Sequence, residues 1–270
     1  MKLKLLILPL ALAACSPTSQ VATAAPPAKQ VASSLTAAQK EKIGRKIWQN
    51  ESGGTRDGLT AWNSSEDFPS LGIGHFIWYP AGIEGPFTES FPQFITFAQR
   101  SGSTPPAVAR LADSPWRSKS QFDSAFRSPE MNALRNYLAA TVPLQTDFII
   151  QKSLAAVPKL LAAAPASDRQ RISANYQKVA TTPNGQYALI DYVNFKGEGT
   201  NPSERYKGSG WGLTQVLQEM RDVPAGQPAA REFANAAKRV LDRRIANAPR
   251  KETQWRAGWH NRAETYTRPL

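Results

Sequence analysis

The chain has very little cysteine and histidine. Its 270 residues contain one cysteine, Cys15, and two histidines, His75 and His260. One cysteine cannot form an intrachain disulfide, and so few sulfur and imidazole groups make a zinc site of the usual ligands unexpected. No phosphate-binding loop is recognisable either, so we expect no metal and no organic cofactor. Any catalysis then depends on carboxylates, hydroxyls or single bases.

Acidic residues and long apolar runs are also scarce. The chain carries 33 Lys and Arg against 21 Asp and Glu, a net charge of +12, and its hydrophobic share of 41% is ordinary for a globular protein. This composition excludes a disordered acidic chain, a collagen-like chain and a polytopic membrane protein. The length allows one large domain or two small ones.

The one long apolar run lies at the N-terminus. Lys2 and Lys4 precede an apolar stretch over residues 5–14, which is too short to span a bilayer. Basic residues followed by a short apolar stretch are typical of a secretory signal. The run ends in Leu-Ala-Ala-Cys, which resembles the lipobox of bacterial lipoproteins, where the cysteine becomes the lipidated first residue. The resemblance implies a signal peptide over residues 1–14, lipidation at Cys15 and, from Ser16, a periplasmic protein anchored to the outer membrane. The alternative is a plain secretory signal with a chance cysteine.

The segment after the signal has the composition of a linker. Residues 15–35 are mostly Ser, Thr, Ala, Pro, Gln and Val, with no periodic apolar face. About 20 such residues span roughly 25 Å root-mean-square. We expect a flexible tether here and a folded domain over residues 36–270.

The folded domain is predicted to be mainly α. Amphipathic spacing and capping residues predict helices over the following ranges: 36–50, 130–140, 145–164 with a possible break at Pro158, 168–180, 187–195, 211–220 and 231–246. Strand signal is confined to residues 70–79, which read as a short hairpin or extended loop.

One carboxylate stands out by its position. Glu51 follows the first predicted helix directly and precedes Gly53 and Gly54, which allow a sharp turn. A carboxylate at a helix C-terminus faces the negative end of the macrodipole, and burial beside Trp48 or Trp62 would also disfavour its ionised form. We therefore expect Glu51 to have a raised pKa and to act as a general acid.

This region carries a family resemblance. A helix ending in Glu51, followed by the Ser-Leu-Gly-Ile-Gly-His run of residues 70–75, resembles phage-type lysozymes of the lysozyme-like superfamily, and more loosely the lytic transglycosylases. Residues 187–199 and 256–266 are similar to the second lobe and the end of those lysozymes, whereas the intervening segments are longer and unlike. The resemblance implies a two-lobed α+β fold with a small β element near the N-terminus.

The resemblance also implies residue roles. Glu51 matches the catalytic acid, Ser70 the hydroxyl residue that holds the attacking water, and His75 a histidine that is usually structural. The family's second carboxylate falls on Ser64, so Asp57, Glu66 and Asp67 are the candidates to replace it. An inverting glycosidase needs two carboxyl groups about 6.5–9.5 Å apart, and a retaining one about 5–5.5 Å. Without a second carboxylate, the pattern is similar to transglycosylases with a single Glu.

Several other side chains are candidate substrate contacts. We consider His75, Trp78, Glu198, Trp211 and Gln215 for sugar binding, through ring stacking or hydrogen bonds. Each also has an ordinary structural interpretation: core aromatics, a buried histidine, a tight loop or a solvated charge. A run of basic residues near the C-terminus suits an anionic polymer, although it can equally be a solvated face. Its members are Lys238, Arg239, Arg243, Arg244, Arg250 and Lys251.

These expectations combine into a lipid-anchored, monomeric periplasmic glycosidase that cleaves the glycan strand of peptidoglycan with Glu51 as general acid. Its expected partners are peptidoglycan and the membrane through Cys15, and nucleic acid is not expected. Three alternatives stay open at this point: a lytic transglycosylase, a wall-binding lipoprotein without catalysis, and a helical lipoprotein that docks a protein partner through an exposed apolar patch.

Overall fold

The computed structural model describes residues 35–85 and 87–270, and the signal peptide, Cys15 and nearly all of the predicted tether lie outside this part. The protein is mainly helical with a small antiparallel sheet. The longer helices are α2 (Ala37–Ser52), α3 (Phe91–Arg100), α5 (Pro129–Ala140), α6 (Val142–Ala163), α7 (Ala166–Ala180), α8 (Pro183–Lys196), α10 (Gln227–Asn247) and α11 (Arg256–Glu264). Shorter helices are α4 (Lys119–Ser124) and α9 (Leu213–Glu219).

The first helix forms for local reasons. Thr36 caps the N-terminus of α2 with a reciprocal capping box to Gln39. Ile43 and Ile47 lie four residues apart and are fully buried, so one face of the helix packs on the core. Gly53 ends the helix in the left-handed conformation, with φ of 64°. Leu35, predicted as the end of the tether, is buried in the core, so the packed domain includes it.

The predicted hairpin is part of a three-stranded antiparallel sheet. Strands β2 (Ser70–Leu71) and β3 (Phe76–Ile77) pair through a four-residue turn, and β1 (Thr60–Ala61) pairs with the other side of β2. A second hairpin, β4 (Arg205–Tyr206) with β5 (Ser209–Gly210), lies in the C-terminal half. The sequence analysis does not predict this second hairpin.

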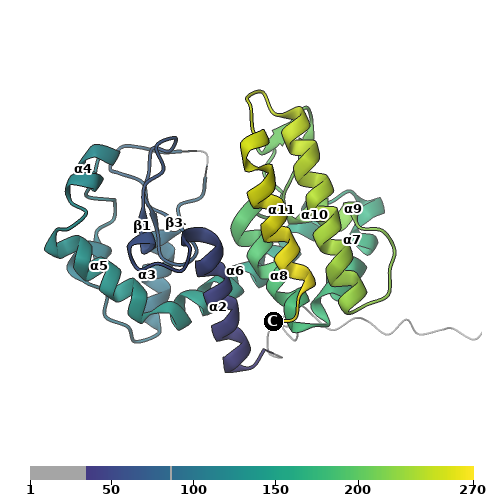
Figure 1. Cartoon of the computed structure of the whole chain (residues 1–270), viewed down its shortest axis with the longest axis horizontal. Coiled ribbons are helices and arrows are strands. Elements are labelled where there is room, and N and C mark those ends of the chain that lie inside the picture. The colour runs from purple at the N-terminus through teal and green to yellow at the C-terminus, as the bar shows by residue number, and fades with distance from the viewer. Residues whose placement is uncertain (1–34, 86) are drawn as a thin grey trace, which may run out of the picture.

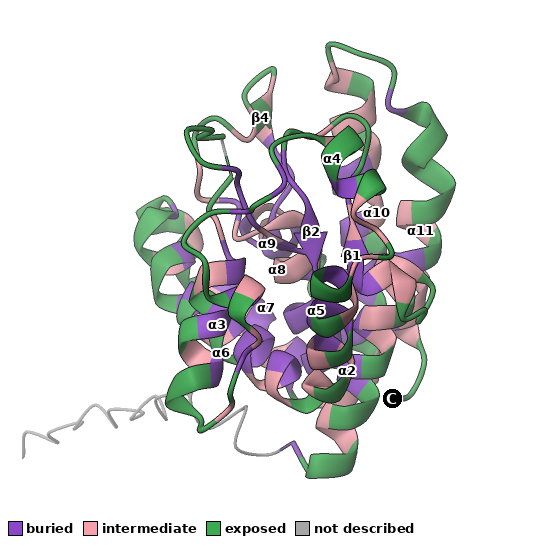
Figure 2. Ribbon diagram, turned by 90° about the vertical axis from the view of Figure 1, so that its left-hand side faces the viewer, coloured by how far each residue is buried: buried purple, intermediate pink, exposed green. Residues whose placement is uncertain are grey.

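Figure 1 shows two groups of elements joined by α6. One group holds β1, β3, α3, α4 and α5, and the other holds α7 to α11, with α2 between the two groups. Figure 2 shows buried residues concentrated on β2, α8 and the inner faces of the surrounding helices, and exposed residues on α4 and the outer side of α11. None of the described helices is long and apolar enough to cross a membrane.

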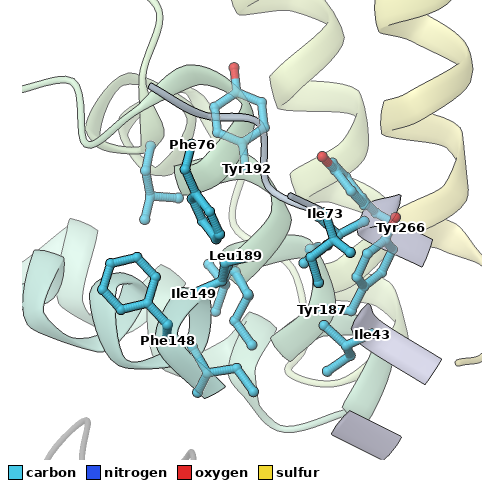
Figure 3. Packing of buried hydrophobic residues seen from close by; sticks show 14 of the residues in the cluster. Ile43, Ile73, Phe76, Phe148, Ile149, Tyr187, Leu189, Tyr192 and Tyr266 are labelled. Carbon is cyan, nitrogen blue, oxygen red and sulfur yellow. The ribbon is translucent and has the colours of Figure 1, made fainter. Parts of the chain in front are cut away.

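The core joins the first hairpin to the helices. Figure 3 shows Ile73, from the turn between β2 and β3, among Ile43 of α2 and Tyr187 and Tyr266 from the C-terminal half. Ile73 and Ile43 are fully buried. The turn is therefore packed into the protein interior, which places its backbone next to the end of α2.

The predicted helices are confirmed within a few residues, and α3, α4, α11, β1 and the β4–β5 hairpin were missed. Contrary to the possible break, α6 continues through Pro158. Among the missed elements, α3 has a visible signal, since Phe91, Phe94, Ile95 and Ala98 are buried at helical spacing. By contrast α11 buries only Arg262 and Ala263, so it has no apolar stripe to detect.

Candidate active site

Glu51 lies in the last turn of α2, where the chain reverses through Gly53 and Gly54. Its side chain is only 16% exposed. One carboxylate oxygen, Oε1, accepts hydrogen bonds from Arg262 Nη2 at 2.7 Å and from Asn194 Nδ2 at 3.1 Å. The other, Oε2, lies 3.7 Å from His75 Nδ1. Groups from α2, α8, α11 and the β2–β3 turn thus meet at one carboxylate.

The electrostatic surroundings of Glu51 differ from the expectation. Burial alone would raise its pKa, as predicted. The positive charge of Arg262, an attraction to His75 and the hydrogen bonds from Arg262 and Asn194 outweigh burial and lower the pKa of Glu51 below its ordinary value. The predicted raised pKa is therefore wrong, because two chain segments more than 140 residues away supply donors and a cation that the local sequence does not show.

Arg262 also joins Glu51 to a second, fully buried carboxylate. Asp191 of α8 accepts from Arg262 Nε at 2.9 Å and Nη2 at 2.8 Å, and from the Tyr266 hydroxyl at 2.6 Å. Asn50 Nδ2 is a further donor at 3.4 Å. Because these contacts occupy both oxygens, Asp191 is hydrogen-bonded as a buried carboxylate must be, and it holds Arg262 in place beside Glu51.

The turn that faces Glu51 is held by two amide side chains. Gln145 of α6 accepts from the Ile73 N–H at 2.8 Å and donates to the Leu138 carbonyl at 2.6 Å. Asn194 donates to the Gly74 carbonyl at 3.3 Å as well as to Glu51. Gly72 has φ of 72°, and a Cβ there would lie 2.3 Å from Gln145 Oε1, so the turn requires glycine. The hairpin turn is thus fixed relative to the carboxylate.

His75 is brought to the site, although in a structural setting. It has φ of 49°, an uncommon conformation for a residue with a side chain. Its Nδ1 faces Glu51, while its Nε2 is buried with no hydrogen-bond partner in the described part of the chain. His75 thus lies next to the carboxylate, and its predicted role as a substrate contact stays a prediction.

The other predicted catalytic residues are not in contact with Glu51. Ser70 is 8% exposed and lies in β2 between β1 and β3, and no hydrogen bond in the described structure joins its hydroxyl to Glu51. Glu66 is half-buried, and burial raises its pKa. Glu66 and Asp67 act electrostatically on the Tyr79 hydroxyl. The catalytic roles expected for Ser70, Glu66 and Asp67 stay predictions.

Two predicted sugar contacts are structural instead. Trp78 is fully buried, packs on Phe91 and Trp116, and donates its indole N–H to the Ala112 carbonyl. Its predicted stacking on substrate is wrong, because no face of the ring reaches the surface. Trp211 is corrected in the same way, since it is 8% exposed and its ring packs against Tyr206, with centroids 4.6 Å apart.

Gln215 fastens the loop before α9. Both ends of its amide bind backbone: Oε1 accepts from the Gly212 N–H, and Nε2 donates to the Gly199 carbonyl. The amide nitrogen has a second hydrogen, so the predicted hydrogen bond to a sugar hydroxyl stays a prediction.

Glu198 is a partly exposed group beside a lysine. Its carboxylate lies 3.2 Å from Lys159 Nζ, and its backbone carbonyl accepts from the Thr214 N–H and hydroxyl. The side chain is 26% exposed. Its predicted contact with substrate stays a prediction.

Cations and aromatic rings alternate next to Glu51, and sequence reasoning missed most of this set. We call it the cation–aromatic column; its members are Arg262, Phe195, Lys196, Trp259, Arg244 and Trp211. Lys196 Nζ lies 4.0 Å from the centroid of the Phe195 ring and 3.9 Å from that of Trp259. Burial, then the charges of Arg244 and Arg262, hold the pKa of Lys196 well below its usual value. Trp255, which is 40% exposed, stacks on Trp259.

The predicted basic face near the C-terminus is mostly paired. Arg239 and Arg243 bind Glu219, Lys238 binds Glu264, and Arg244 forms two hydrogen bonds with Glu252, which is buried. Their charges are largely compensated within the domain, so a continuous free cationic surface does not form along α10. Within residues 35–85 and 87–270 no three His, Cys, Asp or Glu side chains cluster as metal ligands would.

The residues missed at the site had weak sequence signals. Asp191 and Asn194 carry no motif of their own and lie among residues that read as ordinary helix, and Arg262 lies in a helix that has no apolar stripe. The only available hint was that residues 187–199 and 256–266 resemble segments of phage-type lysozymes. Comparisons with family models, with curated proteins and with solved structures found no match for this chain.

Proposed function

We propose that the protein cleaves glycosidic bonds in the glycan strand of peptidoglycan, with Glu51 as general acid, and that its domain is a two-lobed member of the lysozyme-like superfamily. The observation that carries the proposal is the assembly around Glu51. A carboxylate at the end of α2, held by Arg262 and Asn194, faces the glycine-rich turn of a small antiparallel sheet. This is the placement that the resemblance to phage-type lysozymes leads us to expect.

In the proposed reaction Glu51 donates its proton to the bridging oxygen as the bond between that oxygen and the sugar carbon breaks. Water then attacks that carbon and gives up its proton to a second carboxylate, for which Asp57, Glu66 and Asp67 are the candidates, and this completes hydrolysis. Arg262 and Asn194 lower the pKa of Glu51, so its carboxyl is mostly ionised in the free protein at neutral pH. The protonated fraction of this carboxyl grows as the pH falls. We expect kcat/KM, which reports the free enzyme, to rise from neutral to mildly acidic pH.

A specific observation favours a second candidate reaction. No hydrogen bond among the described residues joins Glu66 or Asp67 to Glu51, whose carboxylate is bonded to Arg262 and Asn194, and Asp191 is fully buried with its oxygens occupied. A glycosidase that lacks a second carboxylate at the bond has no group to activate water or to trap the sugar. A sugar hydroxyl of the substrate can then close on the same carbon, with Glu51 taking up its proton. This is the transglycosylase reaction, and it leaves an anhydro end.

The cation–aromatic column supports a glycan as substrate. Trp259 and the exposed Trp255 provide apolar ring faces, which suit the C–H faces of sugars, and Lys196 provides a hydrogen-bond donor for a sugar oxygen. Lys196 forms no ion pair among the described residues. The two tryptophans lie on the same side of the molecule as Arg262, since Trp255 is the N-cap of α11, and Trp259 and Arg262 follow it at spacings of four and three residues.

The proposal includes the location of the protein. The basic residues, the short apolar run and the lipobox-like end of the first 15 residues support a lipoprotein signal with lipidation at Cys15. Peptidoglycan lies in the periplasm, within reach of a domain anchored to the outer membrane. The proposed substrate and the proposed location of the protein are therefore consistent with each other.

The decisive variant is Glu51→Gln, which keeps the shape of the side chain and removes its acid. Purified sacculi are incubated with the parent protein and the variant, and released muropeptides are identified by mass spectrometry. We expect release by the parent and none by Glu51→Gln, with circular dichroism unchanged. Glu41→Gln is the matched control, because Glu41 lies on the same helix in an exposed pair with Arg45.

The products separate the alternatives. Reducing ends indicate hydrolysis, and anhydro ends indicate transglycosylation. Release by Glu51→Gln at the rate of the parent would refute the role of this carboxylate. Binding of sacculi by the parent with no product would favour a wall-binding protein without catalysis.

A further inference from the structure

A second concave site lies in the C-terminal half, away from Glu51. It is a pocket of about 540 Å³ between the end of α6, the β4–β5 hairpin, α9 and α10. This volume is within the range of small-molecule sites. Its lining is polar and includes Thr200, Arg205, Ser209, Gln218 and Arg243. Both charged residues of the lining are arginines, so the pocket favours an anion.

The two arginines are not equivalent. Arg243 donates from both terminal nitrogens to Glu219 Oε2, at 3.0 and 3.1 Å, so its charge is already compensated. Arg205 has no carboxylate within ion-pair distance among the described residues, and its one hydrogen bond is a long one of 3.4 Å to the Gly208 carbonyl. A guanidinium in this state retains most of its donors for a ligand carboxylate.

The hairpin that carries Arg205 is firmly held. Its turn, Lys207 and Gly208, has positive φ at both residues, the conformation of the tightest two-residue hairpin turn. Tyr206 packs on Trp211 and donates its hydroxyl to the buried Glu252 at 3.2 Å. Arg205 is therefore presented from a rigid base, which lowers the cost of ordering the site when a ligand binds.

The pocket is within reach of a substrate bound at Glu51. Asn194, which donates to Glu51, and Gly199, which lines the pocket, are five residues apart on one chain segment. Even a fully extended chain of this length spans at most about 18 Å. A side branch of a glycan strand bound at Glu51 can cover such a distance. The closeness of the pocket to Glu51 therefore favours a branch of the same substrate over an unrelated soluble anion.

We propose that this pocket binds a carboxylate of the peptide that branches from the glycan strand, and that Arg205 is the residue that recognises it. The inference rests on the proposed function, because it takes the glycan at Glu51 as the parent of the ligand. It adds a specificity: strands that carry acidic peptides bind more tightly than bare strands.

The test measures binding without cleavage, on the full-length protein carrying Glu51→Gln. The probes are a soluble disaccharide-tetrapeptide of peptidoglycan with free carboxylates, and the same compound with its carboxylates amidated. We expect amidation to weaken binding about tenfold, the typical worth of one hydrogen-bonded charge. Arg205→Gln is expected to weaken binding of the free-carboxylate probe by the same factor and to leave the amidated probe unchanged.

Two further variants control for fold and charge. Lys207→Gln removes one positive charge at the tip of the same hairpin, outside the pocket lining, and is expected to change neither affinity. Arg205→Lys is expected to restore part of the loss, because it restores the charge and not the planar fork.

Equal binding of the two probes, or an Arg205→Gln protein that still distinguishes them, would overturn the inference. Cleavage of sacculi by the parent protein is a separate readout. If cleavage occurs and amidation has no effect, only the inference about the pocket fails. If amidation and Arg205→Gln act as expected and no muropeptide is released, the proposed cleavage fails and the pocket stands.

Discussion

Replacing Arg262 by Gln is expected to remove the group on which the whole site depends. In the parent protein Arg262 is 7% exposed in its side chain and is shared by Asp191, which is fully buried, and Glu51, which is 16% exposed. Without the guanidinium, two carboxylates stay in the interior with amide and hydroxyl donors only. Leaving a buried charge without its partner is among the most destabilising changes in a protein.

The expected loss is large. Removing one member of a buried ion pair costs about 3–5 kcal/mol. A globular protein has about 5–15 kcal/mol of unfolding free energy in total. For a chain of this size each kcal/mol lowers Tm by about 2–4 °C, so we expect Arg262→Gln to lower Tm by about 10 °C or more at pH 7. Arg45→Gln, which breaks the exposed pair with Glu41, is expected to change Tm by about 1 °C.

The loss is also expected to depend on pH. In the parent protein the pKa of Glu51 is lowered from 4.5, so its contribution to stability is present above that pH and is lost as the pH falls through the folded pKa. In the variant, burial acts without the guanidinium and raises the pKa. The contribution of Glu51 is then present below pH 4.5 and is lost as the pH rises. The deficit of Arg262→Gln is therefore smaller at pH 5 than at pH 7.

Urea unfolding followed by circular dichroism at both pH values measures this deficit. A deficit of the same size at pH 5 and pH 7 would refute the pKa argument. A deficit no larger than that of Arg45→Gln would show that the network around Asp191 does not stabilise the fold.

The β2–β3 turn and the pH dependence of activity offer two further tests. Gly72→Ala is expected to lower the free energy of unfolding by more than Gly82→Ala: both glycines have positive φ, but only at Gly72 would the new Cβ meet a side chain, at 2.3 Å from Gln145 Oε1. The midpoints of urea unfolding compare the two variants, and equal losses of stability would contradict the tight fit of the turn against Gln145. Asn194→Ala removes a hydrogen bond that lowers the pKa of Glu51, so the pH profile of kcat/KM is expected to move to higher pH. An unmoved profile would show that Asn194 does not tune the acid.

The helices were predictable because their causes are local. The capping box of Thr36 and Gln39, the spacing of Ile43 and Ile47 and the stop at Gly53 all lie within one segment, and the structure confirms the helix they predict. The position of Glu51 at the end of that helix followed from the same pattern. The glycines of residues 72 and 74 likewise indicated a tight turn before its partners were known.

Burial was harder to predict for aromatic residues. Trp78 and Trp211 read equally well as core or as sugar-stacking rings, since composition and spacing do not distinguish a ring that faces inward from one that faces a cleft. Trp78 is enclosed by Phe91 and Trp116, and Trp211 by Tyr206 and Arg244. Those neighbours come from other elements, so only packing decided the matter.

The sequence by itself determined the mainly helical class, the place of the small sheet and the carboxylate at the end of α2, because each depends on residues close together in the chain. Only the tertiary structure decided the charge state of that carboxylate. Arg262 is 211 residues away along the chain, yet its guanidinium lies 2.7 Å from Glu51 because Asp191, which also accepts from Tyr266, holds it there. Burial alone would raise the pKa of Glu51, and a buried cation reverses the sign of the shift.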